Sequence, residues 1–160
     1  MKIEEYIKQK GSTTEGKKSV VFFAAFVVTN LIETIYNAGM EGLTLKQLML
    51  MILVSISEGE TLTRYGAVLG SSRQNIKNLA KELEKKSFVS IRRNENDRRA
   101  CGLYLTDKAK KHFKDTDDYY TDQIRNLFSE FTEEEIELMF EFAPKFLTGV
   151  QRMGKHHEKA

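Results

Sequence analysis

The interval at which apolar residues recur is the feature that most constrains the fold of this chain. Through most of the sequence they recur at steps of three and four residues, as on one face of an α-helix. After Ser87 the period changes to two. The alternating residues are Phe88, Val89 and Ile91 before a polar turn and Leu103, Tyr104 and Leu105 after it. This pattern predicts a mainly α fold with one small β-hairpin.

Capping residues divide the helical part into separate segments. Thr44 and Ser72 are good N-caps for two of them, and Pro144 is expected to kink the last one by removing a backbone hydrogen bond. The predicted helices run from Gly16 to Gly39, from Leu45 to about Ser57, from about Thr63 to Leu69 and from Arg73 to Lys86, and two more start at Thr106-Asp107 and at Thr132.

The third and fourth predicted helices are short and are joined by the tight turn Gly70-Ser71-Ser72. This arrangement is typical of a helix-turn-helix, in which the second helix enters the major groove of DNA. The fourth helix, which follows Ser72, is therefore the predicted recognition helix.

Charge is distributed unevenly along the chain. The net charge is +2, but residues 1–60 carry −1, residues 61–113 carry +8 and residues 114–160 carry −5. The predicted hairpin adds four arginines at its tip, namely Arg92, Arg93, Arg98 and Arg99. Only the central block has the charge of a polyanion-binding surface. A solvated basic face is the alternative that charge alone leaves open.

Composition excludes several protein classes. The 160 residues are 41% hydrophobic and 30% charged, which is typical of a soluble globular domain rather than a disordered chain. One cysteine cannot form an internal disulfide, and zinc-ligand spacing is absent, so no metal or cofactor is expected and a reducing cytoplasm fits best.

The longest uninterrupted apolar run, Val20 to Val28, has nine residues, about half of the ~20 that a membrane-spanning helix needs. We therefore expect no membrane span and no secretion leader. No phosphate-binding glycine loop, nucleophile elbow or metal-binding helix motif occurs, so we do not expect an enzyme.

The order of the predicted elements, together with the string DRRACGLYLTDKAKK at residues 97–111, resembles the MarR family of winged-helix transcriptional regulators. The residues that carry the resemblance are Asp97, Arg99, Ala100, Leu105 and Thr106. The resemblance implies a single domain over residues 1–160. Its winged helix-turn-helix lobe would occupy about residues 44–106, and its dimerisation helices residues 16–39 and 107–153.

The family pattern also implies a function. It implies a cytoplasmic homodimer that binds a pseudo-palindromic operator in double-stranded DNA, acts as a repressor and responds to a small-molecule effector. The first, fifth and sixth predicted helices would form the dimer interface, because their apolar residues need a partner. The effector pocket would be lined by Phe22, Phe26, Tyr36, Met49 and Phe113, although residues of these types more often form a core.

The sequence departs from the family pattern at several positions. Ser87 stands where a glycine usually ends the recognition helix, so we expect no left-handed glycine cap there. Ala109 replaces another common glycine. Tyr65-Gly66 replaces a common Leu-Ala, which predicts a tighter helix crossing or a bulkier wedge. Lys77 and Asn78 replace a threonine and a basic residue, which changes the expected DNA sequence preference.

The residues expected to contact DNA come from the recognition helix and the wing. The predicted base readers are Arg73, Gln74, Asn75 and Asn78, because arginine pairs with guanine and an amide pairs with adenine. We expect Lys77 and Lys81 at phosphates, Ser71 and Ser72 near the backbone, and Arg98 or Arg99 in the minor groove. Resemblance to the family implies that Asp97 orients a wing arginine, and a simple turn-forming role for Asp97 remains open.

The single cysteine and the histidines are not expected to support redox or metal chemistry. Cys101 lies in the predicted wing strand without a resolving cysteine, so redox sensing is not expected. The histidines show no metal-ligand spacing. The alternative function is a winged-helix module that uses its basic surface to bind an acidic protein.

Overall fold

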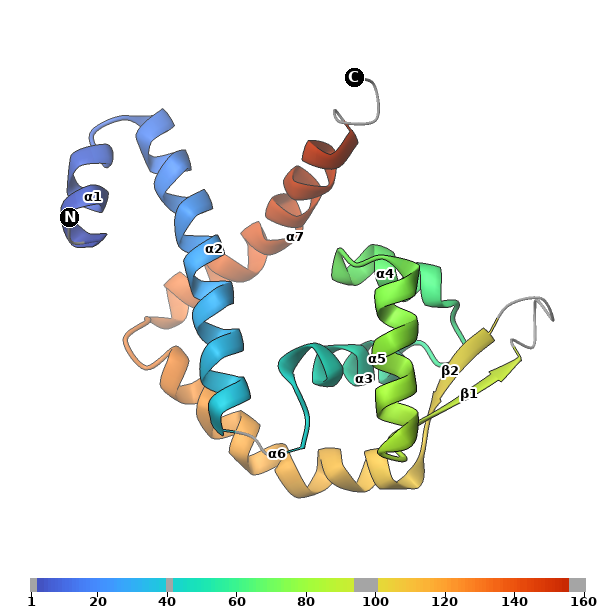
Figure 1. Ribbon diagram of the computed structural model, residues 1–160. Coiled ribbons are helices and arrows are strands. Elements are labelled where there is room, and N and C mark those ends of the chain that lie inside the picture. The colour runs from blue at the N-terminus through green and yellow to red at the C-terminus, as the bar shows by residue number, and fades with distance from the viewer. Residues whose placement is uncertain (1–2, 40–41, 94–100, 156–160) are drawn as a thin grey trace. The chain divides into compact units, whose positions relative to one another are not determined.

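The computed structural model describes residues 3–39, 42–93 and 101–155 and is shown in Figure 1. Contacts within the chain group it into two units, residues 1–111 and 112–160. The elements, in chain order, are α1 (Ile3–Lys10), α2 (Thr14–Gly39), α3 (Leu45–Ile56), α4 (Leu62–Leu69), α5 (Arg73–Lys85), β1 (Val89–Arg93), β2 (Cys101–Leu105), α6 (Asp107–Leu127) and α7 (Glu133–Lys155). The prediction of a mainly α fold with one hairpin is confirmed.

The helix starts follow the predicted caps. The Thr44 side chain accepts a hydrogen bond from the Gln47 backbone N–H, and the Gln47 side chain accepts one from the Thr44 N–H, which completes a capping box before α3. Thr61 caps α4, and Ser72 accepts from the Asn75 N–H at 3.2 Å to cap α5. These caps satisfy orphan N–H groups and fix where each helix begins.

The core of the first unit lies where α3, α4, α5 and the hairpin meet, and Figure 1 shows these elements gathered around α5. Leu50, Met51, Ile76, Leu83 and Leu103 are completely buried there. Each of these side chains contributes about 1.5–3 kcal/mol of hydrophobic free energy on burial, so this cluster is what holds α5 in place.

The hairpin pairs β1 with β2 in antiparallel register, from Val89 opposite Leu105 to Arg93 opposite Cys101. Gly102 also pairs with Thr61, which adds a short third segment to the hairpin. A Cβ atom at Gly102 would lie 2.5 Å from the Gly59 carbonyl oxygen. The third segment therefore approaches β2 so closely that only glycine fits at Gly102.

Helix α5 ends in a left-handed cap that contains no glycine. Ser87 has a φ of 60°, its N–H donates to the Glu84 carbonyl at 2.9 Å, and the Phe88 N–H donates to the Leu83 carbonyl at 2.9 Å. These two bonds form a Schellman motif. The expectation of no glycine cap is met in an unusual way, because serine itself adopts the left-handed conformation.

The predicted tight crossing of α4 and α5 occurs at Gly66. A Cβ atom there would lie 2.5 Å from the Ser71 carbonyl oxygen and 3.5 Å from the Ile76 side chain. Beside it, the buried Tyr65 hydroxyl donates a hydrogen bond to the Ser57 carbonyl. Gly66 therefore permits the close approach, and Tyr65 ties α4 to the end of α3.

Helix α1 was not predicted. Tyr6 of α1 packs edge to face on Phe23 of α2, with ring centroids 5.6 Å apart. Glu4 and Glu5 lie in its first turn and Lys8 and Lys10 in its last. That charge distribution complements the helix dipole and is the signal that would have revealed the helix.

Helix α2 is more apolar than its longest uninterrupted run suggests. By length and composition it is able to cross a membrane, although a single helix of this kind is weak evidence, because core helices and signal sequences pass the same test. Thr29 and Asn30 interrupt the apolar run, but their side chains donate to the Ala25 and Phe26 carbonyls. The length of the uninterrupted apolar run, nine residues, therefore underestimates how apolar the whole helix is.

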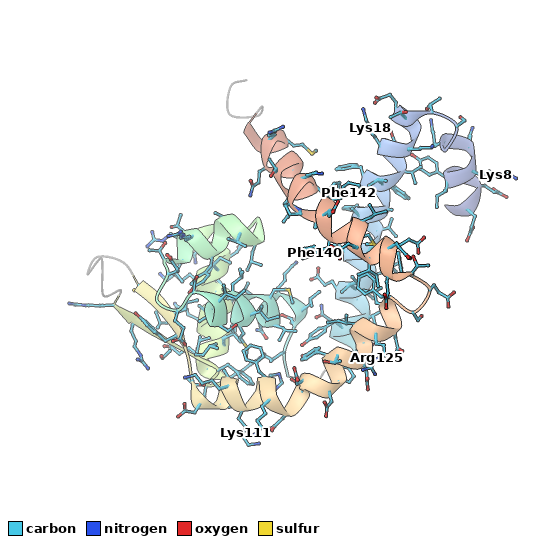
Figure 2. All side chains as sticks on the ribbon, turned by 180° about the vertical axis from the view of Figure 1, so that it is seen from behind. Lys8, Lys18, Lys111, Arg125, Phe140 and Phe142 are labelled. Carbon is cyan, nitrogen blue, oxygen red and sulfur yellow. The ribbon has the colours of Figure 1, made fainter. Side chains whose placement is uncertain are left out.

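The second unit contains most of α6 and all of α7. Thr132 and Glu135 form a capping box, with the Thr132 N–H donating to Glu135 Oε2 at 2.9 Å and the Glu135 N–H to Thr132 Oγ1 at 3.2 Å. The helix continues through Pro144, so the kink stays a prediction. Phe140 and Phe142, labelled in Figure 2, are 74% and 51% exposed on α7.

Candidate nucleic-acid interface

Helix α5 has one buried and one exposed side. Ile76, Ala80 and Leu83 are buried, which anchors the helix to α3, α4 and β1. The predicted DNA-contacting residues lie outside this stripe. Those that are exposed are Ser72, Arg73, Gln74, Asn75, Lys77, Asn78 and Lys81, and Ser71 is half-buried. The structure therefore brings the members of the predicted set that belong to the recognition helix together on the accessible side of α5 and at its N-terminus.

Three cations of α5 have no acidic partner among the residues that the structure describes. In the described ranges, no carboxylate pairs with Arg73, Lys77 or Lys81. These three residues follow one another at steps of four, so their charges lie along one side of α5. Such a row is suited to successive phosphates of a nucleic-acid backbone.

The amide side chains of α5 are partly pre-arranged. Gln74 Nε2 donates a hydrogen bond to Asn78 Oδ1 at 3.2 Å. Asn75 is also exposed, and its backbone N–H is the donor to the Ser72 cap. Ser72 therefore acts as the cap that the sequence predicted, and its hydroxyl sits at the N-terminus of the helix that would approach DNA.

The wing contributes two described arginines, both exposed. The Arg92 guanidinium lies over the Tyr104 ring, 5.1 Å from its centroid, so a cation–π contact holds it against the opposite strand. Arg93 lies opposite Cys101 near the described end of the hairpin. The predicted roles of Asp97, Arg98 and Arg99 fall outside the described residues.

The C-terminal end of α5 is anchored to the elements on either side of the lobe. Lys86 Nζ donates to the Gly42 carbonyl at 2.6 Å and to Gln47 Oε1 at 2.9 Å, before and within α3. Lys108 Nζ donates to the Lys86 carbonyl at 2.7 Å, and Thr106 Oγ1 to the Ser87 carbonyl at 2.7 Å, from the start of α6. These bonds fix the C-terminal end of α5 both to the region around the start of α3 and to the start of α6.

Sequence reasoning missed two residues of this region. Arg64 is exposed at the start of α4 and pairs with Glu60 at 3.0 Å. The first helix of a helix-turn-helix crosses the DNA backbone, and that rule is the signal that could have identified Arg64. Lys86 was missed because its partners, Gly42 and Gln47, are distant in sequence.

One titratable group supports the lobe from inside. Burial raises the pKa of the Tyr65 hydroxyl to about 12, and the nearby carboxylates Glu60 and Glu58 add to the increase. Because the neutral phenol is the favoured form, the hydroxyl keeps its hydrogen bond to Ser57 at physiological pH.

The residues predicted to line an effector pocket are divided between the units. Phe22 and Phe26 are exposed on α2, and Tyr36 and Met49 are half-buried in the first unit. Phe113 belongs to the second unit. The pocket stays a prediction. Cys101 is exposed, so core packing does not account for it.

Comparison with known proteins identifies the family. The sequence pattern described as transcriptional regulator SarA/Rot matches residues 31–116, from the C-terminal half of α2 to the first half of α6. The chain belongs to the SarA/Rot family of transcriptional regulators. SarA/Rot proteins form a family of regulators and not of enzymes, so the expectation of a non-enzyme is confirmed.

Two relatives of this SarA/Rot member agree with that assignment. It is 34% identical over 85 residues to the uncharacterised helix-turn-helix-type transcriptional regulator YcgE of Bacillus subtilis, which covers 53% of the chain and 55% of YcgE. It is 26% identical over 115 residues to the transcriptional repressor MprA of Escherichia coli, which covers 71% of the chain and 65% of MprA. The matches therefore span about half to two-thirds of each relative.

Solved structures share the fold of the SarA/Rot chain. A MarR transcriptional regulator from Methanosarcina mazei has a TM-score of 0.73 at 19% identity, over 83% of this chain and 98% of that one. FabT of Streptococcus pneumoniae in complex with DNA has 0.65 at 17%, over 86% and 99%. PcaV of Streptomyces coelicolor in complex with its natural ligand has 0.68 at 16%, over 79% and 91%. The resemblance to MarR regulators is confirmed as a likeness of fold.

Proposed function

We propose that this regulator binds double-stranded DNA sequence-specifically by inserting α5 into the major groove. The observation that carries the proposal is the accessible side of α5, which lies opposite the buried stripe of Ile76, Ala80 and Leu83. Exposed amides gather there with cations that have no carboxylate partner among the described residues. Arginine and amide side chains read base edges, and lysines bind phosphates. FabT, a protein of the same fold, has been solved in complex with DNA, which supports DNA binding by this chain.

The wing would contact the neighbouring minor groove. Arg92 and Arg93 are exposed on β1, and Arg98 and Arg99 fall between β1 and β2 in the sequence, outside the described residues. A narrow minor groove concentrates negative potential and attracts arginine. In this arrangement Arg98 or Arg99 would enter the groove, with Asp97 orienting one of them.

The active form would be a homodimer. Helix α2 has no buried residue, and large apolar side chains on it, such as Phe22, Phe26 and Ile35, are exposed. On α7 the same holds for Phe140, Phe142 and Leu147. Exposed apolar surface of this extent is typical of an interaction site. A two-fold dimer would present two α5 helices to half-sites about 34–36 Å apart.

Repression would follow from steric blockade of a promoter by the bound dimer in the cytoplasm. MprA is named a transcriptional repressor, which supports this direction of regulation. A small molecule would shift the packing of the dimer helices and so change the separation of the two α5 helices. PcaV with its natural ligand supports an effector, and Phe22, Phe26, Tyr36, Met49 and Phe113 are the proposed lining residues.

The test is an anisotropy titration of the full chain with genomic duplexes, including the region upstream of its own gene, at several salt concentrations. Each phosphate contact releases condensed counterions, so affinity should fall by about 10³–10⁵ between roughly 50 and 200 mM salt if six to ten phosphates are contacted. An affinity that does not change with salt would contradict the proposal.

Charge reversal distinguishes DNA binding from the alternative of an acidic protein partner. Arg73→Glu should abolish duplex binding, because it places a carboxylate where a base edge or phosphate would lie. Arg98→Glu tests the wing in the same way. Arg125→Glu is the matched control, since Arg125 is an exposed arginine of α6 that already pairs with Asp122. Duplex binding that survives Arg73→Glu and Arg98→Glu would favour the protein-interaction module.

A further inference from the structure

The hydrogen bond between Gln74 and Asn78 has a consequence for base recognition. The two side chains lie one helical turn apart on α5, both are exposed, and Gln74 Nε2 donates to Asn78 Oδ1 at 3.2 Å. Within the part of the chain that the structure describes, neither amide bonds to any other group. An exposed pair of this kind contributes little to helix stability. Its effect is to fix the orientation of one amide relative to the other.

Helix geometry places this pair at the outermost line of α5. Successive residues are rotated by about 100° around a helix axis. Counted from Arg73, the buried Ile76, Ala80 and Leu83 lie at about 300°, 340° and 280°, and Gln74 and Asn78 lie at about 100° and 140°. The pair therefore points directly away from the buried stripe and would reach furthest into a groove that α5 enters.

The cationic row lies beside the pair. Arg73, Lys77 and Lys81 fall at about 0°, 40° and 80° on the same scale, between the buried stripe and the amides. In a major groove this places Lys77 and Lys81 toward the phosphate wall and the amide pair toward the base edges, with the proposed base reader Arg73 at the start of the row. The cationic row therefore flanks the amide pair on one side.

The hydrogen bond also determines which groups the pair offers to a base. Each amide has one carbonyl oxygen and two N–H donors. The bond uses one N–H of Gln74 and one lone pair of Asn78. It leaves the whole Gln74 carbonyl oxygen and the whole Asn78 NH₂ group available, together with the second N–H of Gln74 and the second lone pair of Asn78. The pair therefore presents a carbonyl oxygen from one residue beside an NH₂ group from the other.

Building on the proposed function, we propose that Gln74 and Asn78 act as one unit that reads the major-groove edge of an adenine. Adenine carries an acceptor, N7, next to a donor, the N6 amino group, and so complements a free N–H and a free carbonyl oxygen. Guanine places acceptors at both positions, so its O6 would face the carbonyl oxygen. Thymine and cytosine do not present this acceptor and donor combination.

The experiment selects duplexes from a randomised library with the full-length protein and then measures affinities by anisotropy. The wild type, Gln74→Ala, Asn78→Ala and the double variant are compared on the selected duplex. They are also compared on duplexes that carry guanine or 7-deazaadenine at each selected adenine. Lys81→Ala is the control for the cationic row, and thermal unfolding verifies that every variant is folded.

The expected result is one adenine per half-site whose preference over guanine falls about tenfold in both single variants, a typical size for one base contact. The double variant should lose no more than either single variant, because each breaks the same unit. Replacement of N7 by carbon should weaken the wild type and leave Asn78→Ala unchanged. Lys81→Ala should lower the affinity for all sequences equally.

Two results would overturn the inference while leaving DNA binding intact. One is a wild-type base preference retained in Gln74→Ala. The other is a loss at different base positions in the two single variants, which would mean that the amides read bases independently. A wild-type protein that selects no duplex would instead overturn the proposed function, and this inference with it.

Discussion

At the scale of single residues, the backbone at Ser87 is the position where sequence and conformation conflict. The residue adopts a φ of 60°, which favours glycine, and it does so to complete the cap of α5. The free-energy cost of this conformation for a residue with a side chain is about 1 kcal/mol. The fold bears this cost at the end of the helix that carries the proposed base readers.

We predict that Ser87→Gly stabilises the protein by about 0.5–1 kcal/mol, because glycine adopts the left-handed conformation without steric cost. Urea unfolding followed by circular dichroism measures the change. Ser87→Ala is the matched control and should leave the free energy of unfolding nearly unchanged, since alanine keeps the Cβ atom. A destabilised Ser87→Gly variant would show that the serine hydroxyl has a role of its own.

Tyr65 makes a prediction about pH. Its pKa is raised to about 12 from an ordinary 10, so between these values the unfolded chain loses the phenol proton while the folded chain keeps it. The contribution of the neutral Tyr65 hydroxyl to the stability of the fold is complete below pH 10 and is lost as pH rises toward 12. The wild type should therefore lose stability over this interval more steeply than Tyr65→Phe, as measured by urea unfolding at successive pH values. If the free energy of unfolding fell equally with pH in both proteins, the raised pKa of Tyr65 would be refuted.

At the scale of elements, the lobe is the part that the sequence predicts well. Caps at Thr44 and Ser72, the turn at Gly70 and the change of period after Ser87 are local signals, and each marks a boundary that the structure has. Local signals are sufficient there because each residue type acts on its own backbone. The accessible side of α5 follows from the same periodicity.

Features that depend on distant contacts were not predictable in the same way. The packing of α1 on α2 depends on Tyr6 meeting Phe23, and the Lys86 bonds join residues about forty positions apart. The Gln74–Asn78 bond was within reach of the sequence, since amide pairs at this spacing interact, but both residues were read as separate base readers.

Lys86 gives a prediction for the coupling between elements. We expect Lys86→Met to destabilise the lobe by about 1–3 kcal/mol, because the Gly42 carbonyl and the Gln47 side chain each lose a charged hydrogen bond. Lys85→Met is the matched control. Its lysine is exposed and, among the described residues, pairs with Glu82 alone, on the same helix, so the expected change is below about 0.5 kcal/mol. Equal decreases in the free energy of unfolding for the two variants, measured in urea, would show that the Lys86 hydrogen bonds do not stabilise the lobe.

At the scale of the whole molecule, α2 and α7 carry the exposed apolar surface on which the proposed dimer depends. Large apolar side chains line both helices, and many are more than half exposed in the isolated chain. Exposed apolar area of this kind favours association. The DNA-binding proposal requires the same association, because a single α5 reads only one half-site.

We predict that Phe140→Asp shifts the protein from dimer to monomer and weakens operator binding together with it. Phe140 is the most exposed phenylalanine of α7, and a carboxylate buried in an interface is strongly unfavourable. Sedimentation velocity measures the mass. Glu141→Gln changes the neighbouring, exposed polar residue and should remain dimeric. A Phe140→Asp protein of unchanged mass would place the interface elsewhere.

The position of Cys101 has a practical consequence. It is the chain's single cysteine, and it is exposed at the start of β2, opposite Arg93 at the described end of the hairpin. A nitroxide attached to its sulfur would mark each wing once, without prior mutagenesis. In a two-fold assembly the paired spins would report the wing-to-wing separation in free, effector-bound and operator-bound samples.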